Sequence, residues 1–245
     1  MDAIILAAGL GTRLRPLTEN RPKALVEVDG ETLLEINIRR LKNHGIRRIV
    51  VNVHHFADMI AEYISQRDWG VEVIISDERK MLLDTGGALK QAIPLCDSAE
   101  PIVVHNVDIL STIDLESMLK KHITEKNEVT LAVCKRNTMR QLLIDNHGML
   151  QGWRDSKNNQ TIWVDEEKCE TKELAFSGIA IVQPSFATLL PNADRPYPII
   201  PQYLANARNC RIGTFEHEQD EWLDVGKPET LAKAKEFIAK HTKES

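Results

Sequence analysis

Residues 3–28 read AIILAAGLGTRLRPLTENRPKALVEV, and this stretch indicates both the fold and a binding site in the chain of 245 residues. It begins with a run of apolar residues, 3–8, without the alternation of a half-exposed strand. Such a run is typical of a strand buried on both faces of a parallel sheet. Gly9 and Gly11 follow; both are free to take positive φ and leave backbone N–H groups bare, so a phosphate could approach the main chain. Arg13 adds a cation, and we therefore predict a phosphate-binding loop here.

Two better-known glycine-rich loops do not fit this segment. A dinucleotide-binding loop needs a third glycine where Leu14 stands and a helix that begins at once, but Pro16 and Pro22 keep the segment irregular. A P-loop needs a lysine directly after its second glycine, whereas the nearest lysine is Lys23. Lys23 would reach the same phosphates if the proline-rich loop folds back. Together with Arg13 it would then neutralise a polyphosphate.

The composition disfavours several classes of protein. A formal net charge of −5 at pH 7 argues against a general nucleic-acid or membrane-surface binder. The four cysteines are scattered without a C-x-x-C pair, which is typical of thiols in a reducing compartment. The sequence shows neither a signal-peptide pattern nor an apolar run of transmembrane length. We therefore expect a cytoplasmic protein without a nucleic-acid or membrane partner, and no oligomeric state follows from the sequence.

Helix and strand patterns alternate through the first half of the chain. A capping box of Thr32 and Glu35 predicts a helix that stops at Gly45, and Asp84 or Thr85 is expected to cap a later helix. Further helices are expected at residues 57–67 and 114–122, and buried strands at residues 46–53, 71–75, 101–105 and 129–134. This order predicts a Rossmann-like α/β fold with a mixed, mainly parallel sheet flanked by helices. Ligands of such sheets bind beyond the carboxyl ends of the strands.

The second half of the chain has the shorter period of β structure. Strands are expected at residues 141–144, 150–153, 161–164 and 174–182, with polar turns between them. We interpret these strands as a smaller, mixed or antiparallel lobe that covers one side of the first sheet. A last helix is expected to begin at Pro228.

Residues 9–25 read G-x-G-T-R-x-x-P-L-T and then P-K-x-L. This segment resembles, without a gap, the signature of the sugar-1-phosphate nucleotidylyltransferases. The resemblance implies an enzyme that joins a nucleoside triphosphate to a sugar 1-phosphate and releases pyrophosphate, with Mg²⁺ as cofactor. It implies catalytic roles for Arg13, which would stabilise the leaving pyrophosphate, and for Lys23, which would stand between the two reacting phosphates.

A second segment resembles the part of the family's sequence that lies beside the nucleobase. Thr85, Gly86 and Gly87 match its T-G-G-A element beside the base, and Glu78 falls near a base-contacting position. Two glycines in the first turn weaken a helix by about 1 kcal/mol each relative to alanine, which suggests that something flat lies close to the backbone there. Alternatively, these glycines only allow a helix and the sheet to pack closely. The residues that we expect to bind the nucleotide are Leu6, Ala8, Gly9, Gly11, Thr12, Arg13, Lys23, Glu78, Thr85, Gly86 and Asn106.

Two aspartates far apart in the sequence match the metal-binding positions of the family. Asn106 and Asp108 resemble its N-G-D element at the end of a predicted strand, and Asp224 matches the aspartate of W-x-D-V-G-T-P. Mg²⁺ takes one or two carboxylates, while phosphates and water fill its other positions. Asp108 and Asp224 are therefore expected to hold Mg²⁺ across both substrates. His105, just before this pair, is interpreted as a packed strand residue rather than a ligand.

The resemblance is weaker in the half of the chain where the family binds its sugar. Ser177 and Gly178 lie in an F-S-G element and are the candidates for sugar binding. The family's Y-G-V and E-K-P stretches are replaced by RQL at residues 140–142 and WRD at residues 153–155. Trp153 could stack on a sugar or pack within the lobe. The chain is expected to be one nucleotidyltransferase domain, with a nucleotide-binding core at 1–135, a sugar-binding lobe at 136–220, and the metal aspartate and C-terminal helix at 221–245.

Within the family, the overall likeness is to the short uridylyltransferases that act on N-acetylmuramate 1-phosphate in cell-wall recycling. This favours UTP with that sugar phosphate or a related hexose phosphate. The alternatives are a GTP- or dTTP-dependent enzyme for mannose, heptose or glucose 1-phosphate, and, in another class, a non-catalytic nucleotide-sugar sensor or regulatory subunit. Choline-phosphate cytidylyltransferases share the first loop but lack the T-G-G element.

Overall fold

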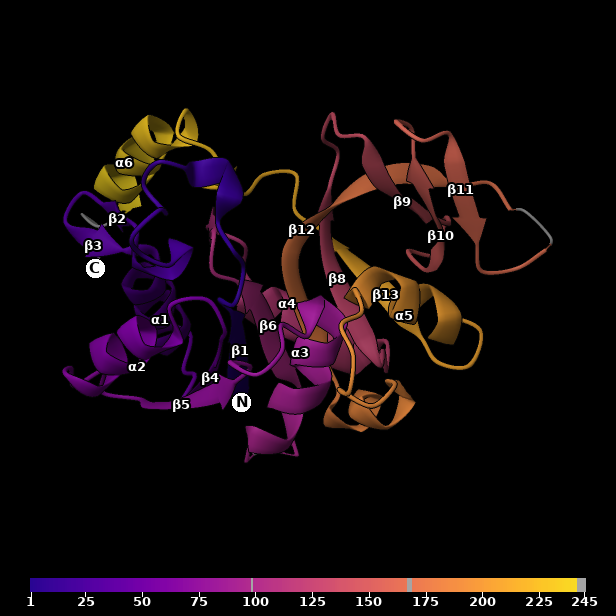
Figure 1. The fold of residues 1–245 in the computed structure, drawn as a ribbon. Coiled ribbons are helices and arrows are strands. Elements are labelled where there is room, and N and C mark those ends of the chain that lie inside the picture. Colours follow the sequence, from indigo (N-terminus) through magenta and orange to yellow (C-terminus); the bar gives the residue numbers. More distant parts are fainter. Residues whose placement is uncertain (98, 167–168, 242–245) are drawn as a thin grey trace.

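The structure is a computed structural model, which describes residues 1–97, 99–166 and 169–241. Within these residues ten strands form one sheet that runs through the whole molecule (Figure 1). Its first half is parallel, in the order β5, β4, β1, β6. The bounds of these strands are Asp2–Leu6 for β1, Arg48–Val53 for β4, Glu72–Asp77 for β5 and Ile102–Asn106 for β6. The predicted Rossmann-like α/β fold is confirmed, and the strand order reverses between β1 and β6, where such sheets bind ligands.

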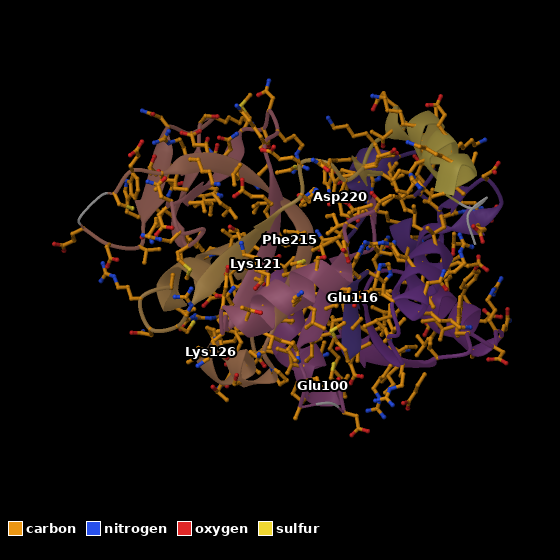
Figure 2. All side chains as sticks on the ribbon, turned by 180° about the vertical axis from the view of Figure 1, so that it is seen from behind. Glu100, Glu116, Lys121, Lys126, Phe215 and Asp220 are labelled. Carbon is orange, nitrogen blue, oxygen red and sulfur yellow. The ribbon has the colours of Figure 1, made fainter. Side chains whose placement is uncertain are left out.

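The apolar run that begins the chain is buried on both faces of the sheet, as predicted. Ala3 and Ile5 belong to one hydrophobic cluster, and Ile4 belongs to the other. The first cluster lies under helices α1, α2, α4 and α6, and the second lies under α3 and α5. These helices are Leu33–Asn43 (α1), Ala57–Ser65 (α2), Asp84–Ala92 (α3), Leu115–Thr124 (α4), Ile199–Asn206 (α5) and Thr230–His241 (α6). Seen from behind, Glu116 and Lys121 mark α4 on the first of these faces (Figure 2).

The ends of two helices test the predicted caps. Thr32 and Glu35 form the predicted capping box at the start of α1, and Gly45 follows the helix with a φ of 76°. At α3 the prediction is wrong, because Leu83 is the N-cap residue and makes no side-chain capping bond. The hydroxyl of Thr85 accepts a hydrogen bond from the backbone N–H of Ile199 at 3.0 Å instead, so it serves the start of α5.

The second half of the chain extends the same sheet. Strand β12 runs antiparallel to β6 and carries two branches, one formed by β9, β10 and β11 and the other by β8 and β13 (Figure 1). The bounds are Val129–Cys134 (β8), Arg140–Ile144 (β9), Leu150–Asp155 (β10), Gln160–Trp163 (β11), Lys172–Val182 (β12) and Ile212–Glu216 (β13). The expected β-rich lobe therefore exists, but it continues the sheet through β12 rather than covering one side of it.

Two small sheets and several short helical turns complete the chain. Strands β2 (Glu27–Val28) and β3 (Glu31–Thr32) form a hairpin after the first loop. Strands β7 (Ile109–Ser111) and β14 (Trp222–Asp224) pair antiparallel. The 3₁₀ turns are Thr12–Leu14, Lys23–Leu25, Ile93–Leu95 and Pro184–Leu189. The pairing of β7 with β14, which the sequence patterns did not predict, brings the C-terminal part of the chain to the end of β6.

Candidate active site

A cavity of about 520 Å³ lies at the carboxyl ends of β1 and β6, where the strand order reverses. It is lined by residues from the first loop, from the ends of β4 and β6, and from the segment that leads into α3. These residues are Leu6, Ala7, Ala8, Gly9, Lys23, Asn52, Glu78, Leu82, Asp84, Thr85, Asn106, Val107, Asp108 and Pro196. Most of the residues that the sequence indicated for nucleotide binding thus line one cavity.

The first loop folds back on itself, as the position of Lys23 required. Of its two glycines, only Gly11 takes a positive φ, at 64°. A Cβ atom on Gly11 would lie 3.0 Å from Thr18 Cγ2 and 3.2 Å from Lys23 Cβ, so the glycine permits the close return of the chain. The Thr18 hydroxyl closes the loop by donating a hydrogen bond to the Gly11 carbonyl at 2.7 Å. A Cβ on Gly9 would meet nothing within 4 Å, which leaves open space beside that backbone.

Two cations and two carboxylates gather at the mouth of this loop. The ammonium group of Lys23, which is 8% exposed, donates a hydrogen bond to Asp108 Oδ2. The Arg13 guanidinium lies 3.9 Å from Asp108 Oδ2 through Nη2 and 3.6 Å from Asp224 Oδ2 through Nη1. Residues from both ends of the chain therefore meet in one electrostatic cluster, which is a suitable arrangement for holding several phosphate groups.

Asp224 reaches this cluster through the small β7–β14 sheet. It pairs with Ile109, and the next backbone N–H, that of Val225, donates to the Asp108 carbonyl at 2.8 Å. A Cβ on Gly226 would lie 2.5 Å from Asp224 Oδ1 and 2.6 Å from Arg13 Nη2. Only a glycine therefore allows Asp224 and Arg13 to come this close beside the backbone, which is a physical reason for the glycine of the W-x-D-V-G motif.

The two carboxylates could hold a divalent cation. Asp224 Oδ1 is buried and has no hydrogen-bond partner among the described residues, so one ligand oxygen is not used by the protein. Asp108 is 17% exposed at its side chain, next to the open cavity. Two carboxylates that both lie within 4 Å of the Arg13 guanidinium are a donor set that suits a hard cation, with the remaining positions left to phosphate and water.

The far end of the cavity is formed by Glu78 and by a residue that the sequence reasoning missed, Asn52. Glu78 is only 2% exposed; its Oε1 accepts from Asn52 Nδ2 at 2.8 Å and its Oε2 accepts from the Leu83 N–H at 3.0 Å. Burial raises the pKa of this carboxyl, while the two hydrogen bonds act in the opposite direction. Asn52 could have been noticed as the one polar residue after Arg48 in the strand sequence RIVVNV, because an amide inside an apolar strand needs buried partners.

The T-G-G element is divided between the cavity and the core. Thr85 lines the cavity, but Gly86 faces Tyr197, because a Cβ on Gly86 would lie 2.5 Å from the tyrosine ring atoms Cδ2 and Cε2. The flat group that the glycines suggested is therefore a ring of this chain. The packing alternative thus accounts for the glycine at position 86, while Thr85 lies at the wall of the cavity.

The two residues indicated for the sugar lie at the other side of Asn106. Gly178 has a φ of 74°, and a Cβ there would lie 2.9 Å from Asn106 Nδ2. Ser177 is completely buried: its hydroxyl is 2.6 Å from His217 Nε2, and its carbonyl accepts from Trp222 Nε1 at 2.8 Å. The Ser177 side chain is thus held inside the protein, whereas the Gly178 backbone approaches the cavity wall at Asn106.

His105 is also buried, as its interpretation as a packed residue required. It has no exposed surface, its Nε2 lies 3.1 Å from Arg40 Nη1, and its Nδ1 lies 2.8 Å from the Asn106 carbonyl. Burial and the neighbouring arginine lower its pKa to about 3. Arg40 is flanked in turn by Asp220, which is visible from behind (Figure 2). Since the ring faces away from the cavity, it takes no part in the cluster of Arg13 and Lys23.

Comparison with known proteins agrees with this geometry. The sequence profile described as "Nucleotidyl transferase" matches residues 2–142, which is more than half of the chain. The chain belongs to the nucleotidyl transferase family and, within it, to the sugar-1-phosphate nucleotidylyltransferases. The prediction of an enzyme that transfers a nucleotidyl group to a sugar 1-phosphate is thereby confirmed.

Two relatives match the chain over nearly its full length. The N-acetylmuramate alpha-1-phosphate uridylyltransferase of Neisseria meningitidis is 37% identical over 98% of this chain and 97% of its own. The protein of the same name from Caulobacter vibrioides is 30% identical over 97% of this chain and 96% of its own. Among solved structures, UDP-glucose pyrophosphorylase from Acinetobacter baumanii superposes with a TM-score of 0.78 at 18% identity, covering 99% of this chain and 94% of that one, and shares the fold.

Among the described residues, no helix is long and apolar enough to cross a bilayer.

Proposed function

We propose that this enzyme transfers the uridylyl group of UTP to N-acetylmuramate 1-phosphate and releases pyrophosphate. The observation that carries the reaction is the convergence of Arg13, Lys23, Asp108 and Asp224 at the mouth of the phosphate-binding loop. The choice of substrates is supported by the two relatives of that name, which this chain matches from end to end.

In the proposed reaction, a phosphate oxygen of the sugar 1-phosphate forms a bond to the α-phosphorus of UTP. The bond from that phosphorus to the bridging oxygen breaks in line, and its electron pair leaves with pyrophosphate. The attacking phosphate is already ionised at neutral pH, so the protein need not supply a general base. Its task is to bring two anions together and to compensate their charge.

The charged residues would divide this task. Backbone N–H groups of the loop around Gly11 would hold the triphosphate. The exposed Arg13 side chain would stabilise the negative charge that develops on the leaving pyrophosphate. Lys23 is fixed by its hydrogen bond to Asp108 and would lie between the two reacting phosphates. When bound by Asp108 and Asp224, Mg²⁺ would supply further charge compensation and would align the two substrates.

The base end of the cavity offers a carboxyl group that suits the N–H edge of uracil. Both oxygens of Glu78 accept hydrogen bonds from fixed donors, Asn52 and the Leu83 N–H, which hold the carboxyl group in place at the wall of the cavity. Uracil offers an N–H donor on its pairing edge, as do thymine and guanine, whereas cytosine and adenine offer a ring acceptor at the corresponding position. The Glu78 carboxyl could accept from the ring N–H of uracil, thymine or guanine, so dTTP and GTP are the first competitors to test.

The proposal keeps the division of the chain that the sequence suggested. Residues 1–135 would bind the nucleotide, residues 136–220 would bind the sugar, and residues 221–245 would contribute the second metal aspartate. Gly178, at the wall beside Asn106, would approach the sugar phosphate through its backbone. Ser177 would act by holding this backbone rather than by touching the sugar, since its hydroxyl is paired with His217.

The test is the release of pyrophosphate with Mg²⁺ across five nucleoside triphosphates and a panel of sugar 1-phosphates that includes N-acetylmuramate, N-acetylglucosamine, glucose, mannose and heptose. We expect UTP with N-acetylmuramate 1-phosphate to exceed every other pair in kcat/KM by at least about tenfold, or ~1.4 kcal/mol. A different leading pair would refute the substrate assignment. A blank panel, with nucleotide binding intact, would contradict the reaction itself.

A further inference from the structure

The side chain of Asn52 connects the two ends of the nucleotide cavity. Asn52 lies on β4, paired through its backbone with Leu6 at the end of β1, and is 3% exposed. Its Oδ1 accepts from the backbone N–H groups of Ala7 at 2.5 Å and of Ala8 at 3.3 Å, the first residues beyond β1. The pairing between β1 and β4 ends at Leu6, and beyond it the Asn52 side chain connects β4 to the start of the phosphate-binding loop.

The other half of the same amide holds the base end. Asn52 Nδ2 donates to Glu78 Oε1 at 2.8 Å, and Glu78 Oε2 accepts from the Leu83 N–H at 3.0 Å. Leu83 directly precedes α3, whose second residue is Thr85. A continuous series of hydrogen bonds therefore runs from Ala7, through Asn52 and Glu78, to the segment that forms the far wall.

Glu78 depends on this series for its hydrogen-bond partners. In the part of the chain that the structure describes, no lysine or arginine lies within ion-pair distance of its carboxylate, although it is buried. Its two donors are an amide N–H of Asn52 and a backbone N–H. Removing the first donor would leave a buried carboxylate with one partner and would free the N–H groups of the loop at the same time.

We propose that Asn52 is a positioning residue for the nucleotide: it holds the phosphate-binding loop and the Glu78 carboxylate at a constant separation, so that triphosphate and base are bound together. Nothing in the signature motifs of the family assigns such a task to this strand residue. The inference rests on the proposed function only in taking the cavity as the nucleotide site.

The first test is Asn52→Ala, measured as the binding of UTP alone and as the KM for each substrate. We expect the Kd and KM for UTP to rise at least about tenfold, equivalent to ~1.4 kcal/mol, while the KM for the sugar 1-phosphate stays within about twofold. The Asn52 hydrogen bonds join two parts of the nucleotide site, so their loss should weaken the binding of UTP and leave the binding of the sugar 1-phosphate unchanged.

A matched control is Asn127→Ala. Asn127 is 1% exposed and bonds through its amide to Thr130 and Glu125, so it is buried and hydrogen-bonded like Asn52. It lies just before β8, near the amino end of β6, on the opposite edge of the sheet from the cavity. This variant should lower the thermal midpoint without changing either KM.

A second variant, Asn52→Asp, separates the two halves of the amide. The introduced carboxylate can still accept from Ala7 and Ala8, but it faces Glu78 with an acceptor in place of a donor. Two adjacent carboxylates share one proton at low pH and repel one another when both ionise. UTP affinity should therefore be closest to that of the wild type at the acid end of the range tested and should fall as the pH rises.

The neighbouring titratable groups are the same in both proteins, so they cancel in the comparison. His54 lies 2.7 Å from the Glu78 carbonyl through Nδ1, Asp84 acts on Glu78 from α3, and Lys23 lines the same cavity. The quantity to compare is the ratio of UTP Kd between Asn52→Asp and wild type at each pH. A ratio that does not change with pH would contradict the shared-proton argument.

Two results would overturn the inference. One is an Asn52→Ala protein that behaves like Asn127→Ala, less stable but with unchanged UTP affinity. The other is an equal rise in the KM of both substrates, which would indicate general distortion of the site. If the wild-type protein bound none of the nucleoside triphosphates, both the nucleotide site and the proposed function would be wrong. The binding measurement on the wild-type protein distinguishes this outcome from a failure of the Asn52 inference alone.

Discussion

Replacing Gly226 by alanine tests whether the position of Asp224 limits the reaction. The new methyl group would lie 2.5 Å from Asp224 Oδ1 and 2.6 Å from Arg13 Nη2. A carbon and an oxygen at van der Waals contact are about 3.5 Å apart, so the carboxylate must retreat by up to about 1 Å. Gly226 does not have a positive φ, so the backbone itself accepts an alanine without strain.

The effect on activity should exceed the effect on stability. A misplacement of about 1 Å in a catalytic group can reduce the rate roughly 10²-fold, and the displaced group here is an expected metal ligand. The side chains of Arg13 and Asp224 are 56% and 36% exposed, so both can move outward at little cost to the fold. We expect kcat/KM for pyrophosphate release to fall about 100-fold, while the free energy of unfolding changes by less than about 1 kcal/mol.

Gly213→Ala provides the matched comparison. Its methyl group would lie 2.5 Å from Asn127 Nδ2, an equally short contact with a polar side chain, but away from the cavity and inside the protein. Overpacking of this kind costs about 1–3 kcal/mol, or roughly 2–12 °C in the thermal midpoint for a chain of this size. Activity should stay at the wild-type level. If Gly226→Ala kept full activity, or if Gly213→Ala lost as much activity, the argument from the Asp224 position would be refuted.

Three further predictions concern the cluster, the core and the response to pH. Lys23→Met removes the ammonium beside Asp108 but keeps the stem, and should lower kcat about 10²–10³-fold with the fold intact by circular dichroism; a loss below tenfold would exclude Lys23 from the chemistry. Gly86→Ala drives a methyl group into the Tyr197 ring and should destabilise by about 1–3 kcal/mol in urea unfolding, with partial rescue by Tyr197→Leu; additive effects would contradict the contact. Burial lowers the pKa of His122 to about 4, so this histidine binds a proton on unfolding between pH 4 and its ordinary pKa of 6.5, and stability should fall as the pH falls through that window. His122→Gln should reduce the slope of unfolding free energy against pH by about 1.4 kcal/mol per unit near pH 5, and an unchanged slope would show that His122 is not the source.

The elements that the sequence predicted are those whose signals are local. The apolar run at Ala3, Ile4 and Ile5 marked a strand buried on both faces because each residue meets one of the two hydrophobic clusters. The Thr32–Glu35 capping box lies within four residues of chain, and both bonds that it requires are formed. Such features depend on neighbours a turn or a strand step away, so a sequence pattern contains all of the interacting groups.

The wrong and missing predictions share a different cause. Thr85 was expected to cap its own helix but bonds to Ile199, and the sequence did not indicate that Gly86 packs on Tyr197. Asn52 was missed, although its amide connects three segments of the cavity wall. In each case the partner lies dozens of residues away, and only the packing of α5 and the strand ends determines which polar group meets which.

The sequence alone determined the class of reaction, because its signature motifs can be recognised without a structure. These motifs contain Arg13 and Lys23 in the first loop and the aspartates Asp108 and Asp224. The tertiary structure decided how these groups act together. Asp224 reaches Asp108 because β14 pairs with β7, and the far wall of the cavity is joined to β4 because Asn52 donates a buried hydrogen bond to Glu78. The physical reason is that charge and backbone freedom are properties of single residues, so the sequence shows them directly. Pairing across a sheet and burial of polar groups arise only when distant segments pack together.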